Sequence, residues 1–271
     1  MEQLNNNVIG EFFEKLGILE ENDRDEFFKK IDEKHKVNLT QDLDLAVALR
    51  KDKGNGKIYT VKNKDLETTM DFAGYYYDLY RQFFAWFIDF KNSYDKNLDG
   101  KKILDLGCDN GITTCFIANL YPNSEIIGVD KCKKGIKCAE EIAQKLGVKN
   151  VKFEAVDAKK VDKFFKEEKF DLIVSNPPYI RKADIDGLDR QVKDFEPYNA
   201  LEGGEDGLDF YRKITEESKY FLKNKGILAY EVGHDQASDV IQIMKENGFE
   251  GIYTKCDLQG FERVVIGFYN N

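Results

Sequence analysis

The sequence predicts an α/β fold in which a mainly parallel sheet is covered by helices on both faces. From residue 101 onward, short apolar segments alternate with longer amphipathic segments, which is the pattern of strands and helices in turn. Residues 1–98 instead place apolar residues at helical spacing and predict a mainly helical N-terminal domain. Residues 99–271 are therefore expected to form a second domain that contains the sheet.

The N-terminal segment divides into three predicted helices and one strand. The helices are expected at 11–31, 41–56 and 70–90, and the strand at 56–63. The last helix places aromatic residues at spacings of three and four. Core packing is the simpler interpretation of this aromatic face, and docking of a partner is the alternative.

The second domain is predicted element by element from the same alternation. Strands are expected at 101–107, 124–130, 151–157, 170–176, 226–233, 251–257 and 263–269, and helices at 112–121, 133–147, 208–222 and 238–249. The last two strands are separated by a few residues around Gly260, which predicts an antiparallel hairpin. Residues 176–206 show no clear periodicity, and a connection of that length at the carboxyl end of a strand is typical of a functional loop.

Composition and charge disfavour several functional classes. The formal net charge is −9, and neither residues 1–98 nor the remainder is basic, which disfavours a nucleic-acid partner. The five cysteines form no C-x-x-C pair and there are two histidines, so no metal site is expected. An odd number of cysteines fits reduced thiols and a cytoplasmic location. The N-terminus has no signal-peptide pattern, and the longest wholly apolar run, 83–88, is too short to span a membrane.

The segment "ILDLGCDNG" has the form of an apolar strand, an acid, a glycine loop and the start of a helix. Gly107 and Gly111 allow a tight turn, and Asp105, Asp130 and Asp157 fall at or near the ends of three strands. An acid at the second of these strand ends can accept hydrogen bonds from both ribose hydroxyls. Because the loop lacks the middle glycine of G-x-G-x-x-G, a nucleoside ligand such as S-adenosylmethionine is favoured over a dinucleotide. Turns also use Gly and Asp routinely, so the pattern is weak by itself.

The strand at 170–176 runs directly into Asn176-Pro177-Pro178-Tyr179. Neither proline has an N–H to continue a sheet ladder, so the chain must leave the sheet here. The Asn176 side-chain oxygen and the Pro177 carbonyl can accept the two hydrogens of a planar amide or amine nitrogen. Tyr179 can stack on the planar group and orient it for methyl transfer. The alternative is that the two prolines only stop the strand.

These residues resemble the class I S-adenosylmethionine-dependent amino-methyltransferases. The match is closer to the release factor glutamine methyltransferase family, which the stretches "VSNPPYI", "DFEPYNALEGGEDGLDFYRKI", "YEVGHDQ" and "DLQGFERVVIGF" all resemble. The resemblance runs from about Lys101 to the last residue. It implies a Rossmann-like seven-stranded sheet with an antiparallel last strand, and a preceding domain that docks the substrate. It implies N5-methylation of the Gly-Gly-Gln glutamine of peptide chain release factors in translation termination, with S-adenosylhomocysteine as the second product.

The resemblance also assigns roles to particular residues. It places the cofactor on Gly107, Cys108, Asp109, Asn110, Gly111, Asp130, Ala158 and Asn176. The strand-end acids Asp105 and Asp157 are expected to complete the cofactor site. The substrate glutamine is expected on Asn176, Pro177, Pro178 and Tyr179, of which Asn176, Pro177 and Tyr179 are the predicted catalytic residues. The stretch "EPYNALEGG" is expected to form the wall of a lid.

Three departures from the family pattern leave alternatives open. Asp109 occupies the place of the usual middle glycine, and Ala158 the place of a frequent aromatic residue. The family's proline-containing stretch before the catalytic domain has only "KDLETTMDF" as its counterpart. One alternative is an amino-methyltransferase that acts on adenine or guanine in nucleic acid. Another is a binding module that has lost the cofactor and docks a partner through the aromatic helix.

Overall fold

The computed structural model describes the sheet-containing part of the chain almost completely. The described residues are Phe12, Lys15, 58–62, 67–71, Phe84, Phe87, Lys91, 98–157, 161–165, 169–187, 198–256 and 260–270. The chain divides into two compact units. One comprises residues 82–182 and 202–271, and the other comprises residues 1–81 and 183–201. The predicted boundary at residues 98 and 99 stays a prediction.

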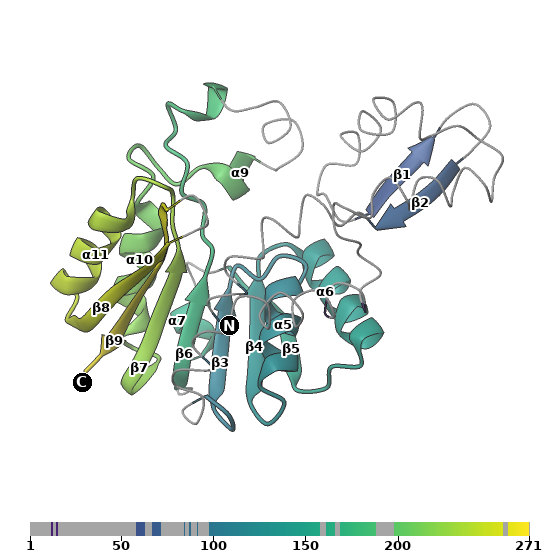
Figure 1. Cartoon of the computed structure of the whole chain (residues 1–271), viewed down its shortest axis with the longest axis horizontal. Coiled ribbons are helices and arrows are strands. Elements are labelled where there is room, and N and C mark those ends of the chain that lie inside the picture. The colour runs from purple at the N-terminus through teal and green to yellow at the C-terminus, as the bar shows by residue number, and fades with distance from the viewer. Residues whose placement is uncertain are drawn as a thin grey trace. The chain divides into compact units, whose positions relative to one another are not determined.

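A seven-stranded sheet forms the centre of the larger unit (Figure 1). Its strands are β3 (Lys102–Leu106), β4 (Glu125–Asp130), β5 (Val151–Ala155), β6 (Phe170–Ser175), β7 (Leu222–Glu231), β8 (Phe249–Cys256) and β9 (Glu262–Tyr269). They lie side by side in the order β5-β4-β3-β6-β7-β9-β8. The pairs from β5 to β7 are parallel, whereas β9 is antiparallel to both β7 and β8. The predicted mainly parallel sheet and the terminal hairpin are both confirmed.

Helices cover the two faces of this sheet. They are α5 (Ile112–Leu120), α6 (Lys133–Leu146), α7 (Val161–Phe164), α10 (Asp209–Ser218) and α11 (Ala237–Glu246). One core cluster joins Leu104 and Leu106 of β3 to buried residues of α7, α10 and α11. Asp105, which lies between those two leucines, is bonded to Thr114 of α5. Because successive side chains of a strand point to opposite faces, α5 packs on the face opposite α7, α10 and α11.

The two central strands of the sheet are buried on both faces. β6 and β3 are central, and nearly every residue in them is buried: Ile103, Leu104, Leu172, Ile173 and Val174 are all fully inaccessible. Strands buried on both faces read as continuous apolar runs rather than as alternating patterns. The amphipathic helix α6 covers the sheet beside them. It begins after Cys132, whose Sγ accepts from Gly135 N, and ends at Gly147 in the left-handed conformation.

In the smaller unit the structure describes one hairpin, two short helical segments and the helical residues Phe12 and Lys15. Strands β1 (Ile58–Lys62) and β2 (Glu67–Asp71) pair antiparallel. The segments η4 (Ile185–Gly187) and α9 (Tyr198–Leu201) come from the long connection after β6. A strand near residues 56–63 is therefore confirmed. The predicted helix 70–90 is wrong at its start, because Met70 and Asp71 pair with Tyr59 and Ile58 in the hairpin.

The described part of that aromatic segment supports core packing. Phe84 and Phe87 are helical and fully buried, and the Phe84 ring stacks on Phe116 of α5 with centroids 3.8 Å apart. The other aromatic residues of the segment, and the helices predicted at 11–31 and 41–56 apart from Phe12 and Lys15, lie outside the described residues. Within the described part of the chain, no helix has the length and apolar character needed to cross a membrane.

Candidate active site

The sheet register places the predicted site residues in one row. Ser175 of β6, Leu106 of β3 and Val129 of β4 are paired across the sheet. The next residue of each chain segment is Asn176, Gly107 and Asp130, respectively. Neighbouring strands lie about 4.8 Å apart, so this row spans about 10 Å. The motif after β6 and the glycine loop after β3 are therefore adjacent at the carboxyl edge of the sheet, where α/β proteins bind ligands.

The glycine loop is hydrogen-bonded to β4. The backbone nitrogens of Gly107 and Cys108 both donate to the Val129 carbonyl, at 2.8 and 3.0 Å. Gly107 is exposed with φ of +79°, and among the described residues a Cβ at this position would meet no atom within 4 Å. Its open side can therefore face a ligand. Cys108 is 6% exposed and burial raises the pKa of its thiol, so it is a neutral packing residue.

Asp109, in the place of a usual glycine, takes the left-handed conformation with φ of +45°. Aspartate tolerates this region better than most residues because its short side chain bonds locally. Here its Oδ2 accepts from Asn110 Nδ2 at 3.2 Å, and Asn110 Oδ1 accepts from the Ile112 nitrogen at 2.8 Å. Gly111 then precedes α5. The departure at Asp109 therefore preserves the turn that leads into the helix.

Asp130 links the glycine loop to the loop after β4. Its Oδ2 accepts from Asp109 N at 3.1 Å and its Oδ1 accepts from Cys132 N at 2.7 Å. Each carboxylate oxygen keeps a second lone pair, so both can still accept a hydroxyl. The side chain predicted to bind a ribose thus also sets the geometry of the surrounding backbone.

Asp105 has a different environment from the one its position in the sequence suggests. It is 3% exposed, and its Oδ2 accepts from Thr114 Oγ1 of α5 at 2.6 Å. Burial raises its pKa to about 7, the bond from Thr114 opposes this, and Asp130 adds to it. This carboxyl lies inside the molecule under the glycine loop. Its predicted contact with the cofactor stays a prediction.

Two predicted cofactor residues follow β5. β5 is the strand next to β4. Asp157 is half-buried and lies two residues after Ala155, the last residue of β5. This places it further along the same edge, past Asp130. Ala158 lies outside the described residues, so its role stays a prediction.

The Asn-Pro-Pro-Tyr motif leaves the sheet directly after β6. Ser175 Oγ donates to the Leu106 carbonyl at 2.8 Å and joins the ends of β6 and β3. Asn176 is exposed, Pro177 is buried, and Pro178 and Tyr179 are half-buried. The structure thus presents the Asn176 amide at the edge of the sheet and anchors the backbone on both sides of it.

The Tyr179 side chain lies beside a charged pair from β7 and β9. Arg263 Nη2 is 3.5 Å from the Tyr179 hydroxyl, and the guanidinium carbon is 5.9 Å from the ring centroid. The same nitrogen lies 3.8 Å from Glu231 Oε1. Burial raises the pKa of Glu231 to about 7, and Arg263 lowers it. Arg263 therefore contacts both the ring and the hydroxyl of a predicted catalytic residue.

The turn at 203–208 packs against the Asn-Pro-Pro-Tyr motif. Ile180 pairs with Glu202, the Gly203 nitrogen donates to the Ile180 carbonyl at 2.9 Å, and Lys182 N donates to Gly204 O at 3.0 Å. A Cβ on Gly203 would lie 2.7 Å from the Pro178 carbonyl oxygen. The Gly-Gly pair predicted as the wall of a lid is thus packed directly against the backbone of the motif.

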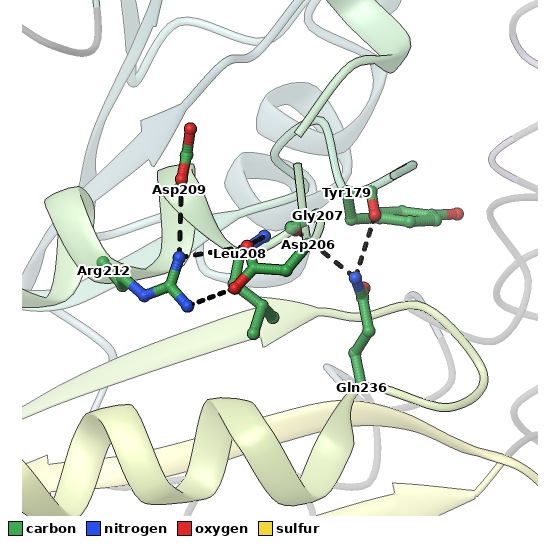
Figure 2. Close-up of polar contacts among 7 residues, drawn as sticks. All are labelled: Tyr179, Asp206, Gly207, Leu208, Asp209, Arg212 and Gln236. Carbon is green, nitrogen blue, oxygen red and sulfur yellow. Dashed lines mark hydrogen bonds and ion pairs between the residues drawn. The ribbon is translucent and has the colours of Figure 1, made fainter. Parts of the chain in front are cut away.

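Figure 2 shows how a side chain before α11 completes this support. Gln236 Nε2 donates to the Tyr179 carbonyl at 2.9 Å and to the Gly207 carbonyl at 3.3 Å. On the other side of the turn, Arg212 Nη1 donates to Asp206 Oδ1 at 3.0 Å, and this pairing lowers the pKa of Asp206. The Gln236 side chain and the Asp206–Arg212 pair therefore both hold the turn against which the motif packs.

Gln236, Arg263 and Glu231 are the residues that sequence reasoning missed. All three stand in stretches that carry the family resemblance, "YEVGHDQ" and "FERVVIGF". They follow the motif by 52 to 84 positions along the chain (57 for Gln236 and 84 for Arg263). A pattern of local spacing cannot place such distant residues beside Tyr179.

Comparison with known proteins agrees with this architecture. Residues 97–257 match a family described as a methyltransferase domain. The match covers more than half of the chain, so the chain belongs to this family of methyltransferase domains. The Rossmann-like methyltransferase fold predicted from the resemblance is thereby confirmed.

Two curated relatives share one description. The chain is 40% identical over 167 residues to a release factor glutamine methyltransferase of Thermodesulfovibrio yellowstonii, covering 62% of this chain and 59% of that protein. It is 41% identical over 169 residues to one of Clostridium acetobutylicum, covering 61% and 58%. A solved methyltransferase of Pyrococcus furiosus aligns with a TM-score of 0.49 at 16% identity, covering 68% of this chain and 81% of that one. This chain thus spans less than two thirds of the length of these curated relatives.

Proposed function

We propose that this chain transfers a methyl group from S-adenosylmethionine to the side-chain nitrogen of a protein glutamine. The acceptor we propose is the glutamine of a peptide chain release factor. The observation that carries the proposal is the exposed Asn176, followed by two prolines and Tyr179, one strand away from the open glycine loop. The names of the two relatives, both release factor glutamine methyltransferases, support the choice of substrate.

The residues at the sheet edge fit the proposed cofactor. Gly107 has an exposed open side, and Asp130 keeps lone pairs for two ribose hydroxyls. The carboxylates of Asp109, Asp130 and Asp157 give this edge a negative charge that suits a cation. When bound, S-adenosylmethionine supplies an electrophilic methyl group.

Asn176 and Pro177 can make the amide nitrogen of the glutamine a better nucleophile. An amide nitrogen is a weak nucleophile because its lone pair is delocalised into the carbonyl. The Asn176 side-chain oxygen and the Pro177 carbonyl can each accept one N–H of the glutamine. Preorganised acceptors of this kind stabilise the charge that develops on the nitrogen and orient it.

Tyr179 completes the acceptor site. Its ring can stack on the planar amide and hold it in line with the methyl group. In the transfer, the bond from the methyl carbon to sulfur breaks, a bond to nitrogen forms, and the amide nitrogen gives one proton to solvent. We assign substrate docking to residues 1–98. Because release factors act in translation termination, the proposal implies a cytoplasmic location.

The acceptor class can be tested with labelled S-adenosylmethionine. A bacterial release factor, DNA and ribosomal RNA are offered in parallel to the purified chain, and cofactor binding is measured by calorimetry. We expect binding of S-adenosylmethionine and label in the release factor alone. Label in nucleic acid alone would show that the motif was interpreted correctly and the substrate wrongly. No cofactor binding would favour the non-catalytic alternative.

A further inference from the structure

We propose that Gln236 is a positioning residue for methyl transfer, which fixes the main chain of Tyr179 and thereby the acceptor groups of the motif. This inference rests on the proposed function, because it concerns the same acceptor site. Gln236 itself is not expected to touch substrate or cofactor. It acts through the backbone at the point where the chain leaves the Asn-Pro-Pro-Tyr motif.

The Gln236 side chain is buried and uses both ends of its amide. It is 2% exposed. Its Nε2 donates to the carbonyls of Tyr179 and Gly207, at 2.9 and 3.3 Å, and its Oε1 accepts from the Gly233 nitrogen at 3.1 Å. It therefore joins the motif, the turn at 203–208 and the end of β7 in one buried group, as Figure 2 shows for the first two.

The contact at the Tyr179 carbonyl controls the motif more than a contact elsewhere would. Prolines hold φ near −65°, so Pro177 and Pro178 leave few backbone torsions free. The torsions of Tyr179 are the next ones along the chain. Fixing its carbonyl thus restrains the backbone torsions of Tyr179, whose Cα carries the ring. Because the two prolines restrict φ, this restraint should extend backward to the Pro177 carbonyl and Asn176.

The turn opposite Gln236 packs closely against the Tyr179 carbonyl. A Cβ on Gly207 would lie 2.4 Å from the Tyr179 oxygen and 2.5 Å from Gln236 Nε2. The Asp206–Arg212 pair and the bond from Leu208 N to Asp206 Oδ1, 3.1 Å, hold the same turn. Since the turn is held separately, loss of Gln236 should release the motif without unfolding its support.

A glutamine at this position differs chemically from a glutamate of the same shape. The two carbonyl oxygens beside Nε2 require a donor. A carboxylate would place a negative charge against both of them, whereas a protonated carboxyl could donate one hydrogen bond. The reference pKa of glutamate is about 4.3, and burial beside acceptors raises it. Gln236→Glu should therefore regain function as the pH falls.

The first experiment compares Gln236→Glu with Gln242→Glu, an exposed position on α11. Each variant is assayed from pH 6 to 8.5 and divided by the wild-type rate at the same pH, with near-UV circular dichroism confirming the folded fraction. We expect the kcat of Gln236→Glu to fall by about 10²-fold at the upper pH. Return of one hydrogen bond should reduce the deficit to about tenfold at the lower pH. The Kd for S-adenosylmethionine and the rates of Gln242→Glu should stay near wild type.

The second experiment reads the position of the motif without using activity. Amide hydrogen exchange is measured in Gln236→Leu, which removes the donor without introducing a charge. Faster exchange at Lys182 N and Gly203 N, with unchanged exchange in β3, is expected, because these amides bond across the motif and its turn.

The outcomes separate this inference from the proposed function. Wild-type exchange in Gln236→Leu, or a pH-independent loss of kcat that parallels loss of cofactor binding, would overturn the positioning role. A wild-type chain that methylates no glutamine would overturn the proposed function. Exchange would still decide the role of Gln236 in that case.

Discussion

At the scale of single residues, the candidate site separates groups that face the ligand from groups that hold them. Asn176 is exposed at the end of β6, whereas Ser175, one residue earlier, is buried and bonded to Leu106. Asp130 serves both purposes, because its oxygens accept backbone hydrogens and remain able to accept hydroxyls. At positions other than Asp130, this division allows each role to be tested by its own substitution.

Asn176→Ala removes one of the two proposed acceptors for the substrate amide. Loss of a single preorganised polar contact in a transition state lowers the rate by about 10²–10³-fold. We expect kcat to fall in this range in single-turnover kinetics at saturating S-adenosylmethionine, and calorimetry measures the separate effect on cofactor affinity, because Asn176 is also a predicted cofactor contact. Asn123→Ala, an exposed asparagine in the turn before β4, is the control. Turnover near wild type in Asn176→Ala would remove the assigned role.

Arg263→Met tests whether the guanidinium beside Tyr179 supports substrate binding. A cation over an aromatic face contributes about 0.5–2 kcal/mol, so we expect the KM for the protein substrate to rise several-fold. The variant also leaves Glu231 buried without its partner, which is destabilising. The double variant Arg263→Met/Glu231→Gln should recover stability in thermal unfolding but not KM. An unchanged KM in Arg263→Met would show that Tyr179 needs no support from this side.

At the scale of elements, the turn at 203–208 is expected to set the position of the motif. Gly207→Ala adds a Cβ 2.4 Å from the Tyr179 oxygen, at φ of +78°. Gly248→Ala meets the same backbone problem at φ of +84°, but with no neighbour within 4 Å. Gly248→Ala should lose about 1–2 kcal/mol of unfolding free energy, and Gly207→Ala should lose more because of the added overlap, both measured by denaturant titration. Only Gly207→Ala should also lose turnover, and equal turnover in the two variants would contradict the role of the turn.

Most elements from residue 101 onward could be predicted because their apolar patterns are local. The central strands are rich in apolar residues, and the two prolines end β6 where predicted. The sequence pattern does not predict β2, because "ETTMD" is short. Met70 joins a hairpin by pairing with Tyr59 of β1, which the pattern of its own segment does not indicate. The inward-facing Asp105 carboxyl could not be predicted, since its bond to Thr114 depends on how α5 packs. The same reason hides Gln236 and Arg263, which lie 57 and 84 positions from Tyr179 along the chain.

At the scale of the whole molecule, two buried carboxyls make stability depend on pH. Burial raises the pKa of Asp105 from 3.8 and that of Glu231 from 4.5, each to about 7. Between about pH 4 and 7 the folded protein therefore binds more protons than the unfolded chain. Their contribution to stability is full below the unfolded pKa values and is lost as the pH rises through the folded values, so unfolding free energy decreases with pH.

Asp105→Asn should flatten this dependence. Asparagine can still accept the hydrogen bond from Thr114 but does not titrate. A shift of this size corresponds to a difference on the order of 2–4 kcal/mol. We expect the fall in Tm from pH 5 to pH 8 to be smaller in Asp105→Asn than in wild type. Asp99→Asn, an exposed position in the turn before β3, is the control. A pH profile identical to wild type would show that the Asp105 carboxyl is charged throughout.

The proposed function depends on Asn176, the exposed amide at the end of β6, directing methyl transfer to a glutamine nitrogen. The most direct test is tandem mass spectrometry of a release factor after incubation with this chain and S-adenosylmethionine. A matched substrate in which the Gly-Gly-Gln glutamine is replaced by alanine is treated in parallel. We predict one added methyl group on the side chain of that glutamine and none in the matched substrate. A methyl group on another residue, or equal labelling of both substrates, would contradict the account.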